Sequence, residues 1–438
     1  MNGYFAVATE ISDDSGSPHT LEHLIFMGSK KYPYKGLLDT LGNRLYSQTN
    51  AWTSTDQTVY TLTTAGWDGF KTLLPIYLDH LFNPTLTDEA CLTEVYHVDG
   101  NGKEKGVVFS EMQGIQGQSW FETSNQLQKI LYAPELGYSS ETGGLMAELR
   151  HLTNDKIKEF HKSMYRLDNL CVIITGSIDQ DELLQIMTDF DAELQELPPV
   201  GQQHKRPFVD SKHDEPLTED IVKVVEFPET DESTGEVLMS WIGPLGDDPV
   251  TNTAVDMVGA AFTDSAISLF NKHLVEIDNP YATEIEYHTD DYYRTALNFT
   301  CNGVPTGKLN ELVNKLKQLI KSQTNPEEFD LLYMRQIINQ QRLKFISQTE
   351  KSPIAFSNIA ILDFIYGKPD GNDLAKWAKN LDEYDELLTW TSDQWCDLIR
   401  KYFVDNKCAA VLGTPSRKLN DEVKKQQRES VSYTHLTL

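Results

Sequence analysis

A repeated segment constrains the fold of this chain more than any other feature of its sequence. Residues 165–176 align without gaps with residues 402–413, and five of the twelve positions are identical. Each copy has the pattern of a helix end, an Asp-Asn turn and an apolar strand that stops at a glycine. Because this local design occurs twice, we expect two homologous domains that arose by duplication.

The boundary between these domains is expected where hydrophobic periodicity is lost. Residues 197–207 are rich in Pro, Gly and polar side chains, which is typical of a linker. We therefore predict a first domain over residues 1–200, a linker over 201–218, a second domain over 219–415 and a tail over 416–438. The tail follows a charged stretch and carries no domain signal, so a non-native origin is one interpretation of its sequence.

Both halves of the chain mix helical and strand patterns. Residues 70–82 place apolar side chains at helical spacing, whereas residues 57–63 alternate as in a strand. In the second half, residues 221–227 and 237–241 have strand patterns, and residues 309–320 form an amphipathic helical pattern. The predicted fold class is α+β, with two homologous domains that each contain a mainly antiparallel sheet with helices packed on it.

The strongest chemical signal is an H-x-x-E-H motif. Ser17 and Pro18 precede it where a helix N-cap and a first helical position belong. On the helix that follows, His19 and His23 are four residues apart, so both imidazoles lie on one face and can hold one zinc ion. Glu22 projects beside them, where its carboxylate can deprotonate a water molecule without being a metal ligand.

A catalytic zinc site needs a third protein ligand and leaves the fourth position to water. Glu104 and Glu111 are seven residues apart, which would place both carboxylates on one face of a predicted helix. One of them can bind the metal while the other accepts the N–H of a ligand histidine. A purely structural zinc site is disfavoured, because such sites normally have four Cys or His ligands.

This combination of motifs resembles a known family. The H-x-x-E-H motif, followed ~90 residues later by a Glu-x6-Glu pair, is similar to the inverzincin metallopeptidases (peptidase family M16), which include insulin-degrading enzyme, pitrilysin and presequence protease. Residues 28–33 and 49–53 also resemble this family, nearest to its presequence-protease branch. The resemblance covers most of residues 4–190 by specific motifs, and the remainder by architecture.

The resemblance implies a role for each residue of the motif. His19, His23 and Glu111 would be the zinc ligands, and Glu22 would be the general base. Glu104 would be the carboxylate that supports a ligand histidine. The second half of the chain has no H-x-x-E-H motif, as in the inactive second domain of family members.

The family also implies how a substrate binds and what the whole protein looks like. Asn50 and Ala51 fall where relatives keep an edge strand whose backbone pairs with the substrate, a form of β-augmentation. Relatives of this branch are about twice as long, with four related domains that form two bowls around a chamber. We therefore expect this chain to start inside its first domain, to supply one bowl, and to work with a missing C-terminal half.

Composition excludes several other classes of protein. With 38 Lys and Arg against 66 Asp and Glu, the net charge of −28 argues against binding to nucleic acid. No stretch approaches the ~18 apolar residues of a membrane-spanning helix, so no membrane association is expected. The five cysteines are odd in number and widely spread, which favours reduced thiols and an intracellular location in the cytoplasm or mitochondrial matrix.

From these observations we expect a zinc endopeptidase that cleaves peptides or unfolded polypeptides inside a chamber. Zinc would polarise the scissile carbonyl, and Glu22 would move the proton of water to the leaving amine. The alternative is a non-catalytic structural or assembly subunit of the same superfamily, like a processing-peptidase subunit or a core protein. Such subunits typically lose motif residues, and this chain keeps His19, Glu22, His23 and Glu111.

Overall fold

The computed structural model describes residues 1–194, 205–211, 214–352, 354–368, 370–378 and 380–434. These residues form two compact units. Unit 1 contains Met1–Gln116, Ser140–Lys212 and Ser430–Leu438, and unit 2 contains Gly117–Ser139 and His213–Glu429. The border lies within the expected linker 201–218, of which residues 201–204, 212 and 213 are outside the described part. Residues 117–139, which we assigned to the first domain, group with unit 2.

Unit 1 is built around one antiparallel sheet with the strand order β2-β3-β1-β6. The strands of this sheet are β1 (Asn2–Ala8), β2 (Ser47–Thr53), β3 (Gln57–Thr64) and β6 (Leu170–Thr175). A small second sheet pairs β4 (His97–Val98) with β5 (Glu104–Lys105). The α-helices are α1 (Ser17–Ile25), α2 (Leu37–Arg44), α3 (Trp67–Phe82), α4 (Asp88–Glu94), α5 (Val107–Ile115), α7 (Met146–Leu149), α8 (Asn154–Met164) and α9 (Gln180–Glu193).

Unit 2 contains a five-stranded sheet with the order β7-β11-β8-β10-β9, in which only β7 and β11 are parallel. Its strands are β7 (Ile221–Pro228), β8 (Thr234–Leu245), β9 (Glu284–Asp290), β10 (Arg294–Pro305) and β11 (Cys408–Ser416). Its helices are α6 (Ser119–Leu131), α10 (Pro249–Thr263), α11 (Leu309–Ser322), α12 (Leu331–Lys351), α13 (Ile354–Tyr366), α14 (Leu374–Trp377), α15 (Asn380–Leu387) and α16 (Ser392–Ile399). The predicted tail contains helix α17 (Arg417–Thr434).

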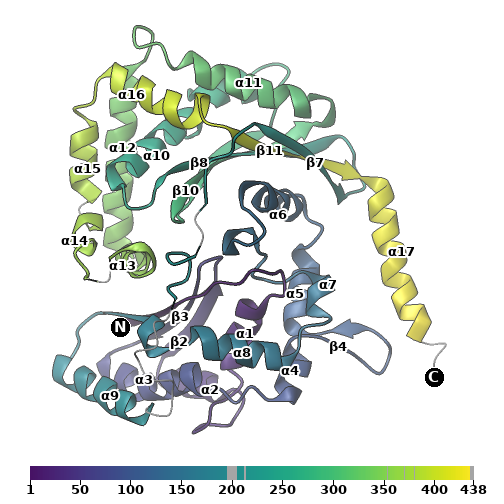
Figure 1. Ribbon diagram of the computed structural model, residues 1–438, viewed down its shortest axis with the longest axis vertical. Coiled ribbons are helices and arrows are strands. Elements are labelled where there is room, and N and C mark those ends of the chain that lie inside the picture. Colours follow the sequence, from purple (N-terminus) through teal and green to yellow (C-terminus); the bar gives the residue numbers. More distant parts are fainter. Residues whose placement is uncertain (195–204, 212–213, 353, 369, 379, 435–438) are drawn as a thin grey trace. The chain divides into compact units, whose positions relative to one another are not determined.

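Helices cover both faces of the unit 2 sheet. In Figure 1, α11 and α16 lie on one side of the sheet and α6 lies on the other. Helix α6 is fastened to β8 by a buried hydrogen bond, in which the Thr123 hydroxyl donates to Oε1 of Glu236 at 2.6 Å. This contact explains why residues 117–139 belong to unit 2 although they lie between two segments of unit 1 in the sequence.

The two units repeat one topology, as the duplicated segment predicts. Strands β2-β3-β1-β6 of unit 1 correspond in order and direction to β9-β10-β8-β11 of unit 2. The side-chain amide of Asn169 donates to the carbonyls of Ala8 and Met164. In unit 2 the amide of Asn406 donates in the same way to the carbonyls of Ile242 and Tyr402. The repeat therefore encodes a similar turn that is anchored to the same central strand.

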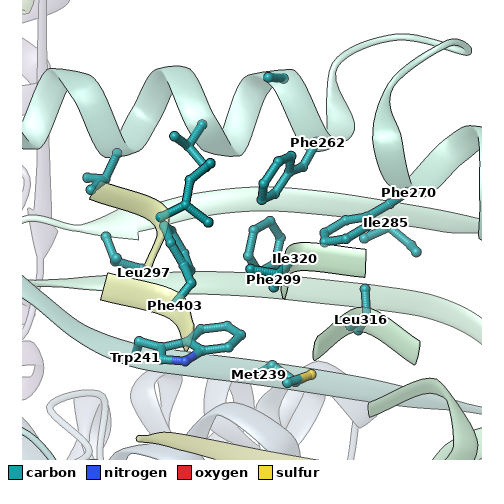
Figure 2. Packing of buried hydrophobic residues seen from close by; sticks show 14 of the residues in the cluster. Met239, Trp241, Phe262, Phe270, Ile285, Leu297, Phe299, Leu316, Ile320 and Phe403 are labelled. Carbon is teal, nitrogen blue, oxygen red and sulfur yellow. The ribbon is translucent and has the colours of Figure 1, made fainter. Parts of the chain in front are cut away.

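An aromatic cluster stabilises unit 2. Phe299 of β10 is fully buried, and its ring lies 5.1 Å from the rings of Phe270 and Tyr287 and 6.0 Å from that of Trp241. Figure 2 shows this ring between the sheet and the helix that carries Phe262. Burial of several such rings supplies much of the hydrophobic free energy of a domain.

Several predicted elements agree with the structure. The helix expected over residues 70–82 is α3, the strand over 57–63 is β3, and the helix over 309–320 is α11. No helix in the described part of the chain is both long enough and apolar enough to cross a membrane.

The prediction of a single helix from Glu104 to Glu111 is wrong. Glu104 belongs to strand β5, and helix α5 begins at Val107. Gly106 separates them with a φ of +133°, and a Cβ atom there would lie 2.1 Å from the carbonyl oxygen of Val95. The chain can therefore make this turn against Val95 only with glycine, and the turn prevents the helix from reaching Glu104.

Candidate metal centre

The first helix of unit 1 begins one residue earlier than expected, because a glycine caps it. Gly16, with a φ of +71°, is the N-cap of α1, whereas Ser17 and Pro18 are already helical. A Cβ atom on Gly16 would lie 2.6 Å from Cα of Gly144 and 2.7 Å from the carbonyl oxygen of Gly143. The close approach of these two backbones brings the Gly143 carbonyl next to the first histidine of the helix.

Three side chains from two helices converge at the start of α1. His19 and His23 lie on one face of α1, with ring centroids 5.0 Å apart. Oε2 of Glu111, from α5, lies 3.4 Å from Nε2 of His19 and 3.4 Å from Nε2 of His23. Within the described part of the chain, this is the one group of three His, Cys, Asp or Glu residues whose ligand atoms all lie within 4.8 Å of one another.

The spacing of these atoms fits a tetrahedral zinc ion. Two ligand atoms that are each ~2.1 Å from zinc and subtend a tetrahedral angle lie ~3.4 Å apart. The two Nε2–Oε2 distances have this value without any ion present. The two histidine side chains are about one-fifth exposed and that of Glu111 is 50% exposed, so one side of the group is open to water or a substrate.

His19 is oriented by the backbone. Its Nδ1 lies 3.3 Å from the carbonyl oxygen of Gly143, which can only accept a hydrogen bond. This contact places the proton on Nδ1 and leaves the lone pair of Nε2 directed at Glu111, as a metal ligand requires. The segment that carries Gly143 is held by the Asp14 side chain, which accepts from the amide of Glu141 at 2.8 Å.

A carboxylate that the sequence analysis did not identify lies near Nδ1 of His23. Oε2 of Glu94, at the end of α4, lies 3.9 Å from Nδ1 of His23, and Oε1 of Glu94 accepts from Lys35 at 3.1 Å. The Glu94 side chain is only 10% exposed. Burial lowers the pKa of His23, and the neighbouring His19 lowers it further, which favours the neutral imidazole that binds metals.

Glu104, the carboxylate expected to support a ligand histidine, binds Arg150 and Tyr96 instead. Its carboxylate accepts from the guanidinium of Arg150 at 2.6 and 3.1 Å and from the Tyr96 hydroxyl at 3.0 Å. Arg150 therefore holds the pKa of Glu104 below its usual value. The described contacts of Glu104 include neither histidine, and Glu94 is the carboxylate found near Nδ1 of His23.

The expected base, Glu22, is held by the end of strand β2. The Thr53 hydroxyl donates to Oε2 of Glu22 at 2.6 Å, which orients the carboxylate beside the two histidines. Asn50 and Ala51 lie three and two residues before Thr53 on the same strand. Among the described residues, β2 pairs only with β3, so it forms an edge of the sheet. A single edge strand thus carries both the support of Glu22 and the residues expected to meet a substrate.

Sequence reasoning named the three side chains that the structure brings together, and named Glu22 beside them, but it missed Glu94, Thr53 and the Gly143 carbonyl. These groups come from segments far apart in the sequence and become neighbours only through the fold. Thr53 lies in the segment 49–53 that resembles the inverzincins, and this is the one signal that could have suggested it.

The chain is similar to several known proteins. A family model described as insulinase (peptidase family M16) matches residues 8–112, and one described as peptidase M16 inactive domain matches residues 151–336. An uncharacterized protein of Saccharomyces cerevisiae is 48% identical to this chain over 98% of its length. The matched region makes up 42% of the yeast protein. Presequence protease 1 of Arabidopsis thaliana is 32% identical over 42% of this chain and 18% of its own length.

A solved structure shows the same fold. The structure of a protease from Helicobacter pylori superposes with a TM-score of 0.71 over 94% of both chains, at 17% sequence identity. By contrast, the chain spans less than half the length of the curated relatives that it matches. The two family models together cover most of the sequence, and they place the H-x-x-E-H segment in the insulinase match. This chain belongs to peptidase family M16.

Proposed function

We propose that this chain is the zinc-binding part of an endopeptidase that hydrolyses peptides or unfolded polypeptides. The observation that carries the proposal is the convergence of two imidazole nitrogens and one carboxylate oxygen at zinc spacing, with Glu22 held beside them. Zinc, when bound by His19, His23 and Glu111, would supply Lewis acidity that activates water and polarises a carbonyl group.

The residues of the chain carry out the proton transfers. Oε2 of Glu22 accepts the hydrogen bond from Thr53, which leaves Oε1 to take a proton from water. The same carboxyl group then passes that proton to the leaving amine. The Gly143 carbonyl holds the imidazole of His19 in the orientation that binds the metal, and the negative charge of Glu94 favours a proton on Nδ1 of His23.

Strand β2 is the proposed binding site for the peptide. An extended peptide that pairs with the edge at Asn50 and Ala51 would continue past Thr53 toward Glu22, because successive strand residues advance by ~3.3 Å. A cavity of ≈ 510 Å³ lies along the first half of this strand, between Ser47–Asn50 and helix α2. Backbone pairing fixes the direction of the peptide, and this cavity offers space for a side chain.

We further propose that the active enzyme encloses its substrate with a second half. The relatives are more than twice as long as this chain, and several are named presequence proteases of mitochondria or chloroplasts. Exclusion of water and orientation of the substrate are worth several kcal/mol of barrier. We therefore expect residues 1–438 alone to cleave an unstructured peptide at least ~100-fold more slowly than together with a C-terminal half, a difference of ~2.7 kcal/mol.

The test separates metal binding from chemistry. Wild-type protein should contain close to one zinc by elemental analysis, and His23→Ala should lose it. Glu22→Gln should keep the zinc but lose peptide cleavage, followed by mass spectrometry, by several orders of magnitude. Zinc at the wild-type level in His23→Ala would contradict the ligand assignment. A zinc-bound protein that cleaves no peptide even with its second half would instead support a non-catalytic subunit.

A further inference from the structure

Glu22 is connected to a series of buried hydroxyl groups in the interior of unit 1. The Thr53 hydroxyl donates to Oε2 of Glu22 at 2.6 Å and lies 3.4 Å from the Thr58 hydroxyl. The Thr58 hydroxyl also hydrogen bonds to Tyr165, whose own hydroxyl lies 2.7 Å from that of Tyr60. We call Thr53, Thr58, Tyr165 and Tyr60 the hydroxyl network.

The fold gathers the network on one face of the unit 1 sheet. Thr53 of β2 pairs directly with Thr58 of β3, and Tyr60 lies two residues further along β3. Side chains at these positions share a face of the sheet, because side chains alternate along each strand. Helix α1, which carries Glu22, packs on both strands, and Tyr165 follows the last residue of α8. The network therefore joins two helices to two strands.

The far end of the network is fixed in place. Tyr165 is only 2% exposed, and its ring stacks on that of His161 with centroids 4.9 Å apart. Nε2 of His161 lies 2.8 Å from the carbonyl oxygen of Leu81, which can only accept, so the imidazole donates there. Thr58 and Tyr60 are fully buried. The network is thus held by the protein interior and is shielded from water.

The two tyrosines remain neutral donors. Burial raises the pKa of Tyr60 and of Tyr165, and the negative charge of Glu22 raises both further. Both hydroxyls therefore keep their protons at neutral pH. The ionised carboxylate of Glu22 can only accept hydrogen bonds, so it favours the arrangement in which the hydroxyl protons of the network point toward it. Hydrogen bonds that are aligned in this way strengthen one another.

We propose that Thr58, Tyr165 and Tyr60 are positioning residues for Glu22. They keep the Thr53 hydroxyl directed at Oε2, which leaves Oε1 free to take a proton from water. Without them the Thr53 side chain can turn to its other staggered rotamers and release the carboxylate. The inference rests on the proposed role of Glu22 as the base.

The size of the expected effect follows from the weakest link. The 3.4 Å between the Thr53 and Thr58 hydroxyls is long for a hydrogen bond between two hydroxyls. The 2.6 Å bond from Thr53 to Glu22 is short and charge-assisted. Loss of a deeper hydroxyl should therefore disturb Glu22 less than loss of the Thr53 hydroxyl.

Infrared spectroscopy of residues 1–438 in EDTA tests the network without metal and without turnover. The carboxylate band of Glu22 is identified from the difference between the spectra of the wild type and of Glu22→Gln. Thr53→Val removes the donor and should shift this band. Thr58→Val and Tyr165→Phe should shift it in the same direction and by a smaller amount, because each interrupts the network at a deeper point. Thr58→Ser keeps the hydroxyl and should restore the wild-type band.

Tyr77→Phe is the matched control. Tyr77 is as deeply buried as Tyr165, and burial and the charge of Glu22 raise its pKa as well. Its hydroxyl, however, donates to the carbonyl of Thr61 at 2.9 Å and not to the network. Tyr77→Phe should therefore leave the Glu22 band at its wild-type position. Thermal melts of all variants check that they are folded.

The same variants can be assayed with zinc bound. Thr58→Val and Tyr165→Phe should each lower kcat by about threefold at unchanged KM and zinc content, whereas Tyr77→Phe should not. The double variant of Thr53→Val and Tyr165→Phe should be no slower than Thr53→Val alone, because the network is already interrupted at its first member.

Two spectroscopic results would overturn the proposal. The first is a Glu22 band that stays at the wild-type position in both Thr58→Val and Tyr165→Phe. The second is a shift in Tyr77→Phe as large as that in Tyr165→Phe, which would indicate a general effect of buried hydroxyls. Failure of the proposed function has a different signature, namely a Glu22→Gln variant that cleaves peptide at the wild-type rate.

Discussion

Substitution of Glu94 offers the sharpest test of how the histidines are held. Glu94→Gln removes the negative charge next to Nδ1 of His23 and preserves the volume of a side chain that is only 10% exposed. Loss of a carboxylate that supports a metal-bound histidine typically weakens metal binding by ~10- to 100-fold. Oε2 of Glu94 is 3.9 Å from Nδ1 of His23, which is longer than a hydrogen bond, and Lys35 also binds this carboxylate. We therefore expect zinc affinity to fall by the lower end of this range, about tenfold or 1.4 kcal/mol.

The matched control for this experiment is Glu104→Gln. It makes the same chemical change ten residues along the chain, at a carboxylate that binds Arg150 and Tyr96 instead of a histidine. Its zinc affinity should stay within about twofold of the wild type. The assay is competition with a chromophoric chelator at fixed pH and ionic strength. A larger loss in Glu104→Gln than in Glu94→Gln would refute the reasoning and restore Glu104 as the supporting carboxylate.

Three further substitutions probe the base, the second unit and its core. Thr53→Val removes the donor to Glu22 and should lower kcat by about tenfold at unchanged KM and zinc content, while Thr53→Ser restores kcat. Asp256→Asn should raise the free energy of unfolding by a few kcal/mol at pH 9 and by little near pH 4, measured by urea titration. Burial raises the pKa of Asp256 to about 8 in the folded protein, against ~4 in the unfolded chain. The wild-type protein therefore loses stability as the pH rises above ~4, because the unfolded chain gives up the proton more easily than the folded protein does. Asn stays neutral at every pH and does not incur this loss. Phe299→Ala should cost ~3–5 kcal/mol in the same titration, because it empties the centre of the aromatic cluster.

The sequence was sufficient to predict features that depend on local spacing or on repetition. Two histidines four residues apart on a helix must share a face, and the repeated Asp-Asn turn indicated two units of similar topology. Prediction failed where one backbone approaches another closely. Gly106 turns against Val95 and ends the helix expected to reach Glu104, and Gly16 caps α1 in place of Ser17. Such contacts depend on segments distant in sequence, which periodicity does not reveal.

The position of Glu94 could not be predicted for a related reason. Glu94 and Glu104 are both acidic residues near the expected third ligand, and nothing in their local sequence distinguishes a carboxylate that faces His23 from one that faces Arg150. The choice is made by the short β4–β5 hairpin, which directs Glu104 toward Arg150 while Glu94 at the end of α4 faces α1. Only the arrangement of these elements in space separates the two roles.

The duplicated topology carries different side chains in its two copies. In unit 1, the helix after the central strand, α1, brings His19 and His23 close to Glu111. In unit 2, the corresponding helix α10 contains no histidine, and burial raises the pKa of its Asp256 to about 8. Among the described residues, the same arrangement of elements therefore gathers possible metal ligands in unit 1 alone. The side chains placed on the helix, and not the topology, decide what chemistry each copy can support.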